Sequence, residues 1–381
     1  MAKRQLVHTP DKQTERDEQT AGYVAAVKQQ GRPRPDPKEV EAAINTPIDK
    51  DMIVNAGDFE RGVISSGSTL LDLAISSNRV RGGGIPAGVI IEIFGPPSSG
   101  KTAVLADIGA SAKFHGGVVK YGDPEARLDT AYARKCGLIL TKSEYYRPDT
   151  VEELEDSLLK WKPKPPDETA ICVRCEDSLA AFSTEKELSK EGHKMGAAKR
   201  AQAFHVLFRK LGRKISKEGW VVACSNQEQD SFGGQGKTTP GGNAIKYWSS
   251  LRIRIFPTWQ KSEVTRRWTI VKGHEAIEKI VGMRSTCKIV KSSCDDPKRE
   301  VPLFIIFGKG IDDIRGNLQW MKETLHLPQY DCVEKNYAQI DPAIRYIEDH
   351  NLEAALREKV IDLWDSIEDH FRIERKEKVR F

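Results

Sequence analysis

The sequence predicts an α/β protein whose core is a mostly parallel sheet covered by helices on both faces. Apolar runs of strand length alternate along the chain with segments in which apolar residues recur every three or four positions, which is typical of such a fold. A glycine-rich loop joins one of these strands to one of these helices. The chain has 381 residues, 39% hydrophobic and 30% charged, which is enough for one large core with smaller appendages.

We expect the strands of the core where apolar residues dominate a short run, because strands of a parallel sheet are buried on both faces. In chain order these runs are residues 88–95, 117–123, 170–178, 219–227, 250–256, 266–273, 285–291 and 302–308. Helices are expected between them at residues 101–116, 132–137, 151–161 and 197–215. The last four strands follow one another by short links, which favours antiparallel pairing for some of them.

The two ends of the chain differ in pattern from this core, which we place at residues 51–313. Residues 1–50 are polar, and their helical pattern stops at a proline-rich stretch, so we expect an N-terminal helical appendage. Residues 314–381 are expected to form a helical C-terminal region. There, apolar residues recur every three or four positions from Leu352 to Phe371 and predict one long amphipathic helix.

The loop between the expected strand at 88–95 and the helix that follows fits the phosphate-binding pattern GxxxxGK[ST]. Its residues are Gly95, Pro96, Pro97, Ser98, Ser99, Gly100, Lys101 and Thr102. In such a loop several backbone N–H groups point at one phosphate, and the start of the helix adds the positive end of its dipole. Lys101 would supply a cation at the β- and γ-phosphates, and the Thr102 hydroxyl would be a ligand of Mg²⁺. The sequence therefore predicts a nucleotide site.

Two acidic residues follow other expected strands and could serve that site. Asp177 ends the strand at 170–178, where a carboxylate can hold the hydration shell of Mg²⁺ from the opposite side. Glu125 follows the strand at 117–123 and could orient the attacking water beside the γ-phosphate, although taken alone it would be interpreted as a loop charge. Arg174 and Glu176 share one face of their strand and interrupt an apolar run, and the sequence leaves open whether they pair.

The chain shows no sign of export or of a cysteine-bound metal. No stretch of about 18 apolar residues is present, and the N-terminus lacks the apolar core of a signal peptide. The seven cysteines are expected as thiols. Cys172 and Cys175 form one CxxC pair without a second pair at zinc-finger spacing, so we interpret them as structural.

Two segments have the composition of nucleic-acid contacts. Residues 184–218 hold ten Lys or Arg against four Asp or Glu, which suits either a phosphate-binding surface or a solvated helix face. Residues 228–243 are rich in glycine and include Phe232 and Lys237. Freed backbone N–H groups could bind phosphates there and Phe232 could stack on bases, and the alternative is an ordinary mobile loop.

Taken in order, these motifs resemble the RecA recombinase family over roughly residues 50–313. The matching segments are VISSGSTLLDLAI, GVIIEIFGPPSSGKT, YGDPEARLDTAYARKCG, CEDSLAAF, HKMGAAKR, SNQ, TTPGGNAIKYWSSLRIRI, KIVK and FIIFGKGID. The resemblance implies a RecA-type P-loop ATPase core, with the N-terminal appendage as a polymerisation segment. It makes Glu125 the catalytic glutamate and Gln227 the sensor of the γ-phosphate, and it assigns adenine contacts to Asp129 and Tyr132.

The resemblance also implies DNA contacts. In the first DNA loop they fall on Met195, Gly196 and Arg200, and in the second on Gly241, Gly242 and Asn243. Lys291 matches a catalytic lysine that reaches the ATP of a neighbouring subunit. The implied activity is DNA-stimulated hydrolysis of ATP with Mg²⁺, in a helical filament that forms on single-stranded DNA and pairs it with a homologous duplex. Such a protein acts in DNA repair in the bacterial cytoplasm, encoded by the cell or by a phage.

The sequence departs from the family at three places. Ser293 stands where a second interface lysine is usual, residues 76–83 are extra, and the C-terminus is basic. Two alternatives therefore stay open: a ring-forming helicase of the same ATPase superfamily, and a paralogue that keeps the fold but hydrolyses ATP poorly.

Overall fold

The computed structural model describes residues 57–188, 196–230, 237–258, 262–268, 276–373 and 375. The N-terminal appendage expected at residues 1–50 lies outside this range. Residues 55–371 form one compact unit. None of the helices described in it is long and apolar enough to cross a lipid bilayer.

The strands are short except for one of sixteen residues. They are β1 (Asp58–Ile64), β2 (Ile85–Ala87), β3 (Ile90–Gly95), β4 (Val119–Gly122), β5 (Tyr145–Tyr146), β6 (Val173–Glu176), β7 (Val221–Gln227), β8 (Gln229–Asp230), β9 (Lys237–Thr238), β10 (Leu251–Pro257), β11 (Glu263–Trp268), β12 (Ile277–Ser292), β13 (Glu300–Ile306), β14 (Gly310–Ile311), β15 (Tyr330–Asp331) and β16 (Asn336–Tyr337).

The helices alternate with the strands as far as α9, are absent among the described residues from β10 to β14, and dominate after β14. They are α3 (Thr69–Ser76), α4 (Lys101–Phe114), α5 (Thr130–Lys135), α6 (Val151–Lys160), the 3₁₀ turn η2 (Leu179–Ala181), α7 (Glu185–Leu188), α8 (Gly196–Glu218), α9 (Asn243–Trp248), α10 (Asp313–Thr324), α11 (Ile340–Asp349) and α12 (Glu353–Phe371).

Among the described residues the main sheet has ten strands, and the expected α/β fold is confirmed. Its order is β14-β13-β12-β10-β3-β7-β6-β4-β5, with β11 paired to β12. The strands from β10 to β5 are parallel, whereas β11 to β14 are added antiparallel, as the short links between them suggested. The parallel strands therefore end at one common edge, which carries the phosphate loop.

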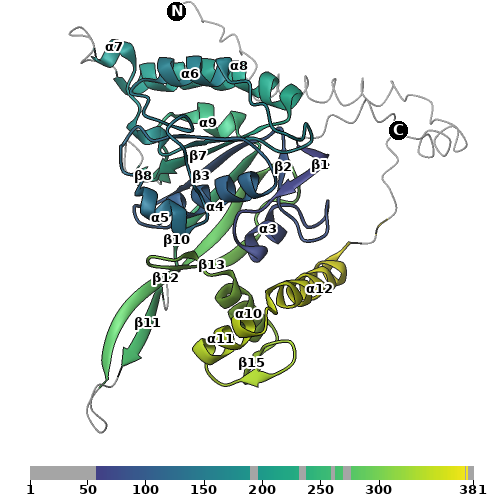
Figure 1. Cartoon of the computed structure of the whole chain (residues 1–381). Coiled ribbons are helices and arrows are strands. Elements are labelled where there is room, and N and C mark those ends of the chain that lie inside the picture. The colour runs from purple at the N-terminus through teal and green to yellow at the C-terminus, as the bar shows by residue number, and fades with distance from the viewer. Residues whose placement is uncertain are drawn as a thin grey trace, which may run out of the picture. The chain divides into compact units, whose positions relative to one another are not determined.

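Helices cover both faces of the parallel part of the sheet (Figure 1). Alternate residues of the strands point to opposite faces. Ile91 and Ile93 of β3 belong to a core cluster with α3, α4 and α5, whereas Ile90 belongs to a second cluster with α6, α8 and α9. The core thus lies on both sides of the central strands and holds β3, β7, β6 and β4 in place.

The helical C-terminal pattern is also found, with additions that the sequence did not predict. The long helix expected from Leu352 onward is α12, which buries Leu356, Val360 and Trp364. The buried residues of α10, α11 and α12 belong to the same cluster as α3 and α4. Between α10 and α11 lies the small antiparallel pair β15–β16.

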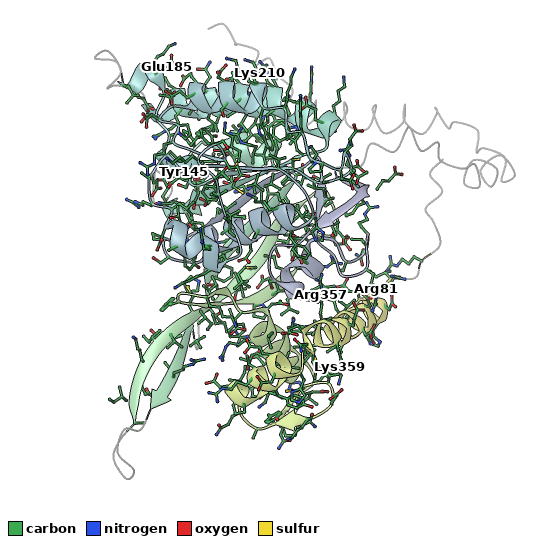
Figure 2. All side chains as sticks on the ribbon, in the orientation of Figure 1. Arg81, Tyr145, Glu185, Lys210, Arg357 and Lys359 are labelled. Atoms are coloured by element: carbon green, nitrogen blue, oxygen red, sulfur yellow. The ribbon has the colours of Figure 1, made fainter. Side chains whose placement is uncertain are left out.

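The extra segment at residues 76–83 packs on α12. The Arg81 guanidinium forms ion pairs of 2.8, 2.8 and 3.0 Å with Glu358, Asp362 and Asp365 (Figure 2). The Trp364 indole N–H donates a 3.0 Å hydrogen bond to the Ser77 hydroxyl. These residues that interrupt the family resemblance therefore connect the core to the C-terminal helix.

The described part of the strand expected at residues 266–273 is β11 (Glu263–Trp268), which begins three residues earlier than expected and pairs with the first part of β12. Residues 269–275 lie outside the described range. Figure 1 shows the two strands extending from the sheet as a ribbon.

Candidate nucleotide site and adjoining loops

The phosphate loop has the strand–loop–helix context that the sequence predicted. β3 ends at Gly95 and α4 begins at Lys101. Gly100 has a φ of +104°, and a Cβ atom there would lie 2.1 Å from Ile305 Cδ1, so only glycine fits. The start of α4 therefore directs its free backbone N–H groups into the loop.

Lys101 lies inside the loop. Its ammonium donates hydrogen bonds to the carbonyl oxygens of Pro96, at 2.7 Å, and Gly95, at 3.3 Å. Burial lowers the pKa of Lys101, and nearby carboxylates, that of Asp177 first among them, act in the opposite direction. A cation held among loop carbonyls in this way is placed to meet a phosphate group.

Asp177 lies opposite the loop, one residue beyond β6. Its Oδ2 accepts hydrogen bonds from the Thr102 hydroxyl at 2.7 Å and from the Tyr121 hydroxyl at 3.0 Å, and its Oδ1 accepts one from Ser225. Mg²⁺ takes only one or two protein oxygens when the substrate phosphates supply others. The Thr102 hydroxyl and the Asp177 carboxylate fit that donor set.

Glu125 comes from the segment after β4 and lies in the same pocket as Lys101, Thr102 and Asp177. Its Oε1 accepts hydrogen bonds from the Ser178 hydroxyl, at 3.1 Å, and the Gln227 amide, at 3.5 Å. Its Oε2 forms a 2.8 Å ion pair with Arg127. The ends of three parallel strands, β4, β6 and β7, thus bring Glu125 into contact with residues 53 and 102 positions further along the sequence.

These groups line a common pocket of about 230 Å³. Its lining consists of Pro97, Ser98, Lys101, Thr102, Asp123, Glu125, Arg127, Leu128, Asp177, Ser178, Ser225 and Gln227. A polar pocket with two cations, three carboxylates and an amide around a phosphate loop can bind a phosphate chain with its metal and position a water beside it.

A second pocket, of about 370 Å³, lies on the other side of the phosphate loop. It is lined by Ser98 to Ala103, Tyr132, Met283, Ile305, Phe307 and Gly308. Its aromatic and aliphatic walls suit a flat ring such as a nucleotide base. The family resemblance assigned Tyr132 to the base. No sequence pattern indicated Met283, Ile305 and Phe307, because they come from β12, β13 and the turn after β13, far along the chain.

Asp129 is positioned differently from Tyr132. Its carboxylate accepts hydrogen bonds from the backbone N–H groups of Ala131, at 2.8 Å, and Tyr132, at 3.2 Å, and so caps α5. Asp129 therefore fixes the helix that carries Tyr132, and it is not among the residues that line this pocket.

The candidate DNA-contact residues gather around a third pocket, of about 410 Å³, that adjoins the first. Its lining includes Arg200 near the start of α8, Thr238, and Gly241 and Gly242 before α9. Gln227 lines both this pocket and the pocket that contains Glu125. Gly196 and Asn243 are the first residues of α8 and α9. Met195 and Phe232 lie outside the described residues.

Other charges near these loops are partly paired. Lys237 on β9 lies 3.8 Å from the Glu228 carboxylate. In the second half of α8, Lys210 and Lys214 pair with Glu155 and Glu218, as expected for a solvated helix face.

Lys291 lies away from the pockets beside its own phosphate loop. Its ammonium donates hydrogen bonds to the carbonyls of Lys246, at 3.0 Å, and Tyr247, at 2.8 Å, at the end of α9. Burial, followed by the charge of Arg252, lowers its pKa. It is not among the residues that line either pocket.

Two further questions from the sequence are answered by contacts. Arg174 Nη2 lies 2.9 Å from Glu176 Oε1, and both side chains are 0% exposed, so the two do pair. All seven cysteines are free and buried. Within the part of the chain that the structure describes, no cluster of His, Cys, Asp and Glu could hold a metal by itself.

Comparison with known proteins shows which family this chain resembles. The family model for the RecA N-terminal domain matches residues 39–312. The chain is 32% identical over 330 residues to the Protein RecA of Rippkaea orientalis, covering 82% of this chain and 87% of that protein. It is 34% identical over 287 residues to the Protein RecA of Allorhizobium ampelinum, covering 72% of each. To the Protein RecA of Thermus aquaticus it is 33% identical over 290 residues, covering 73% of this chain and 78% of that protein. The chain belongs to the RecA family.

Proposed function

We propose that this protein is an ATP-dependent recombinase that forms filaments on single-stranded DNA and pairs that strand with a homologous duplex. The observation that carries the proposal is the position of Gln227. This residue lines the pocket that contains Glu125 and also the pocket that contains the DNA-loop residues Arg200, Gly241 and Gly242. One side chain therefore adjoins both the site of ATP chemistry and the site of DNA contact.

For the ATP reaction, the phosphate loop binds the phosphate chain and Lys101 neutralises its charge. A magnesium ion held by Thr102 and Asp177 would neutralise charge on the β- and γ-phosphate oxygens. Glu125 accepts a proton from the attacking water or orients it. Tyr132 and the apolar wall opposite it hold the base.

For coupling to DNA, the short strand β8 begins two residues after Gln227, and the short strand β9 follows at Lys237. They pair antiparallel within the expected second DNA loop, residues 228–243. The Asn226 amide also donates a 3.0 Å hydrogen bond to the Pro240 carbonyl, at the other end of that loop region. A shift of Gln227 toward a γ-phosphate would therefore be transmitted to both ends of the loop.

Assembly completes the proposal. Lys291 lies away from its own nucleotide pocket, so we assign it to the ATP of a neighbouring subunit. There it would stabilise transition-state charge only in the polymer. Because the partner is DNA and the named relatives are bacterial, we place the protein in the bacterial cytoplasm, encoded by the cell or by a phage.

The test is an ATP-hydrolysis assay with and without oligo-dT, combined with negative-stain imaging and a strand-exchange assay. We expect hydrolysis to be stimulated by single-stranded DNA, filaments to form with ATP, and strands to exchange between homologous substrates. Lys101→Ala is the matched control and should lose turnover. Six-membered rings would favour a helicase, and filaments without stimulated hydrolysis would favour a weakly hydrolysing paralogue, and either result overturns the proposal.

A further inference from the structure

Two consecutive tyrosines on β5 bind buried carboxylates on opposite faces of the sheet. β5 contains only Tyr145 and Tyr146 and lies at the sheet edge, paired with β4. The Tyr145 hydroxyl donates a hydrogen bond to Asp123, and the Tyr146 hydroxyl donates one to Glu176. Neighbouring residues of a strand point to opposite faces, so this strand is held from both sides (Figure 2 labels Tyr145).

On the first face, Tyr145 contacts the carboxylate that organises the segment around Glu125. Asp123 is 2% exposed. Its Oδ2 accepts hydrogen bonds of 2.8 Å from the Tyr145 hydroxyl and from the Leu128 backbone N–H, and its Oδ1 accepts one of 3.2 Å from the Arg127 backbone N–H. The Asp123 carboxylate therefore holds residues 123–128 in a compact turn. In this turn the Glu125 carboxylate accepts hydrogen bonds from Ser178 and Gln227.

On the second face, Tyr146 reaches across β4 to the charged pair in β6. Tyr146, Gly122 and Glu176 lie in register on three adjacent strands. The Tyr146 hydroxyl lies 2.8 Å from both carboxylate oxygens of Glu176, and it also contacts the Arg174 guanidinium. A Cβ atom on Gly122 would lie 2.0 Å from Glu176 Oε2, so the glycine leaves the space that this contact occupies.

The Arg174–Glu176 pair thus acts as an anchor for β5. Its two members are fully buried, and Arg174 also donates hydrogen bonds to Ser157 of α6, at 3.3 Å to the carbonyl and 3.2 Å to the hydroxyl. A buried ion pair is stable only when its remaining hydrogen-bonding groups find partners, and Tyr146 supplies one of them. This gives a role to the two charged residues that make β6 unusual.

We propose that Tyr145 is a positioning residue for ATP hydrolysis, acting through Asp123 on Glu125, and that the Tyr146–Glu176–Arg174 cluster anchors the strand that carries it. The proposal rests on the proposed function, since it assigns Glu125 to the attack of water. Tyr145 itself is not among the residues that line the pocket, whereas Asp123 is. Its effect therefore falls on the catalytic step and not on nucleotide binding.

The test compares Tyr145→Phe with a matched control, Tyr330→Phe. Tyr330 also donates its hydroxyl to one side chain, Gln319, at 3.0 Å, but in the C-terminal region. With oligo-dT present, Tyr145→Phe should lower kcat by about three- to ten-fold, the usual worth of one hydrogen bond. KM for ATP should stay within about two-fold, because the phosphate loop is untouched. The control should leave both constants unchanged.

Hydrogen–deuterium exchange supplies a readout that does not depend on turnover. In Tyr145→Phe the amides of Arg127 and Leu128 should exchange faster, because the Asp123 carboxylate that they bind has lost its third donor. Tyr146→Phe should give the same changes in kcat and exchange by loosening β5 as a whole. A normal kcat with unchanged exchange in Tyr145→Phe overturns the positioning role, as does a loss of nucleotide affinity with normal kcat. If the wild type itself shows no hydrolysis, the proposed function fails instead.

Discussion

The hydroxyl of Thr102 donates a 2.7 Å hydrogen bond to Asp177 Oδ2, joining two residues 75 positions apart. Thr102 is the second residue of α4, and Asp177 follows β6. The contact brings the two proposed oxygen ligands of Mg²⁺ together at the phosphate loop. The role of Thr102 in binding Mg²⁺ can be tested by removing its hydroxyl.

We expect Thr102→Val to raise the Mg²⁺ concentration needed for half-maximal ATP hydrolysis by about tenfold or more, a typical loss when a group that orients a metal is removed. Valine keeps the shape of threonine without its hydroxyl. Titration of turnover with Mg²⁺ measures the effect, and Thr102→Ser, which restores a hydroxyl, should lie close to the wild type. An unchanged Mg²⁺ dependence in the valine variant would remove Thr102 from the metal site.

Glu125→Gln should slow ATP hydrolysis by on the order of 10²–10⁴-fold, the usual contribution of a general base. Binding of ATP and DNA should persist, so that filaments accumulate in the presence of ATP. Single-turnover kinetics and titration with a fluorescent ATP analogue separate the two effects. Glu60→Gln, at an exposed position on β1, serves as the control. If Glu125→Gln fails to bind nucleotide, the glutamate has a structural role.

Lys237→Ala should weaken binding to single-stranded DNA equally for all sequences. Loss of one phosphate contact should also reduce the slope of log K against log salt by about 0.7. Fluorescence anisotropy at several salt concentrations, with oligo-dT and with a mixed-sequence strand, measures both effects. Lys335→Ala, in the C-terminal region, is the control. An unaltered slope would place Lys237 outside the DNA contact.

Lys291→Ala should lose hydrolysis while its circular dichroism spectrum stays that of the wild type. In mixed filaments with Lys101→Ala subunits, activity should partly return. The Lys291→Ala subunits keep a working phosphate loop and receive a lysine from the neighbouring subunit. Ser293 cannot supply a second charge at this place. Titrating the ratio of the two variants measures the rescue, and mixed filaments without any activity would contradict action across the interface.

We expect the stability of the protein to depend on pH through the buried carboxyl of Asp107. Burial, and then the carboxylates of Asp313 and Asp72, raise the pKa of Asp107 to about 8, and its Oδ2 has no hydrogen-bond partner among the described residues. The folded state therefore holds this proton more tightly than the unfolded state. The stability that the protein gains from this bound proton is fully present below about pH 4, and it is lost as the pH rises to about 8.

At pH 8.5, Asp107→Asn should therefore have a higher free energy of unfolding than the wild type, by on the order of 5 kcal/mol, because a shift of about four pKa units is worth about 1.4 kcal/mol per unit. Its unfolding temperature should be higher accordingly. The difference should shrink toward pH 5, where the wild-type carboxyl is protonated. Thermal unfolding at several pH values measures this, with Asp156→Asn on the exposed face of α6 as control. Equal pH profiles for Asp107→Asn and the wild type would show that Asp107 does not hold its proton.

The sequence by itself determined the α/β class and the phosphate loop, and it indicated Asp177 as a carboxylate that could serve this loop. Gly95 to Thr102 are contiguous, and their geometry follows from the local backbone and the start of one helix. Asp177 could be proposed for that loop because it ends an expected strand of the same sheet. The family resemblance then supplied the role of Glu125, together with Gln227 and the DNA-loop residues.

Only the tertiary structure decided contacts that depend on packing between distant elements. Met283 and Phe307 line the same pocket as Tyr132, beside the phosphate loop, because β12 and β13 are added antiparallel to the sheet. Arg174 and Glu176 are compatible with burial because Gly122 leaves room for the Tyr146 hydroxyl between strands. Local patterns specify where strands and helices begin, whereas side-chain partners across a sheet are set by register and close packing.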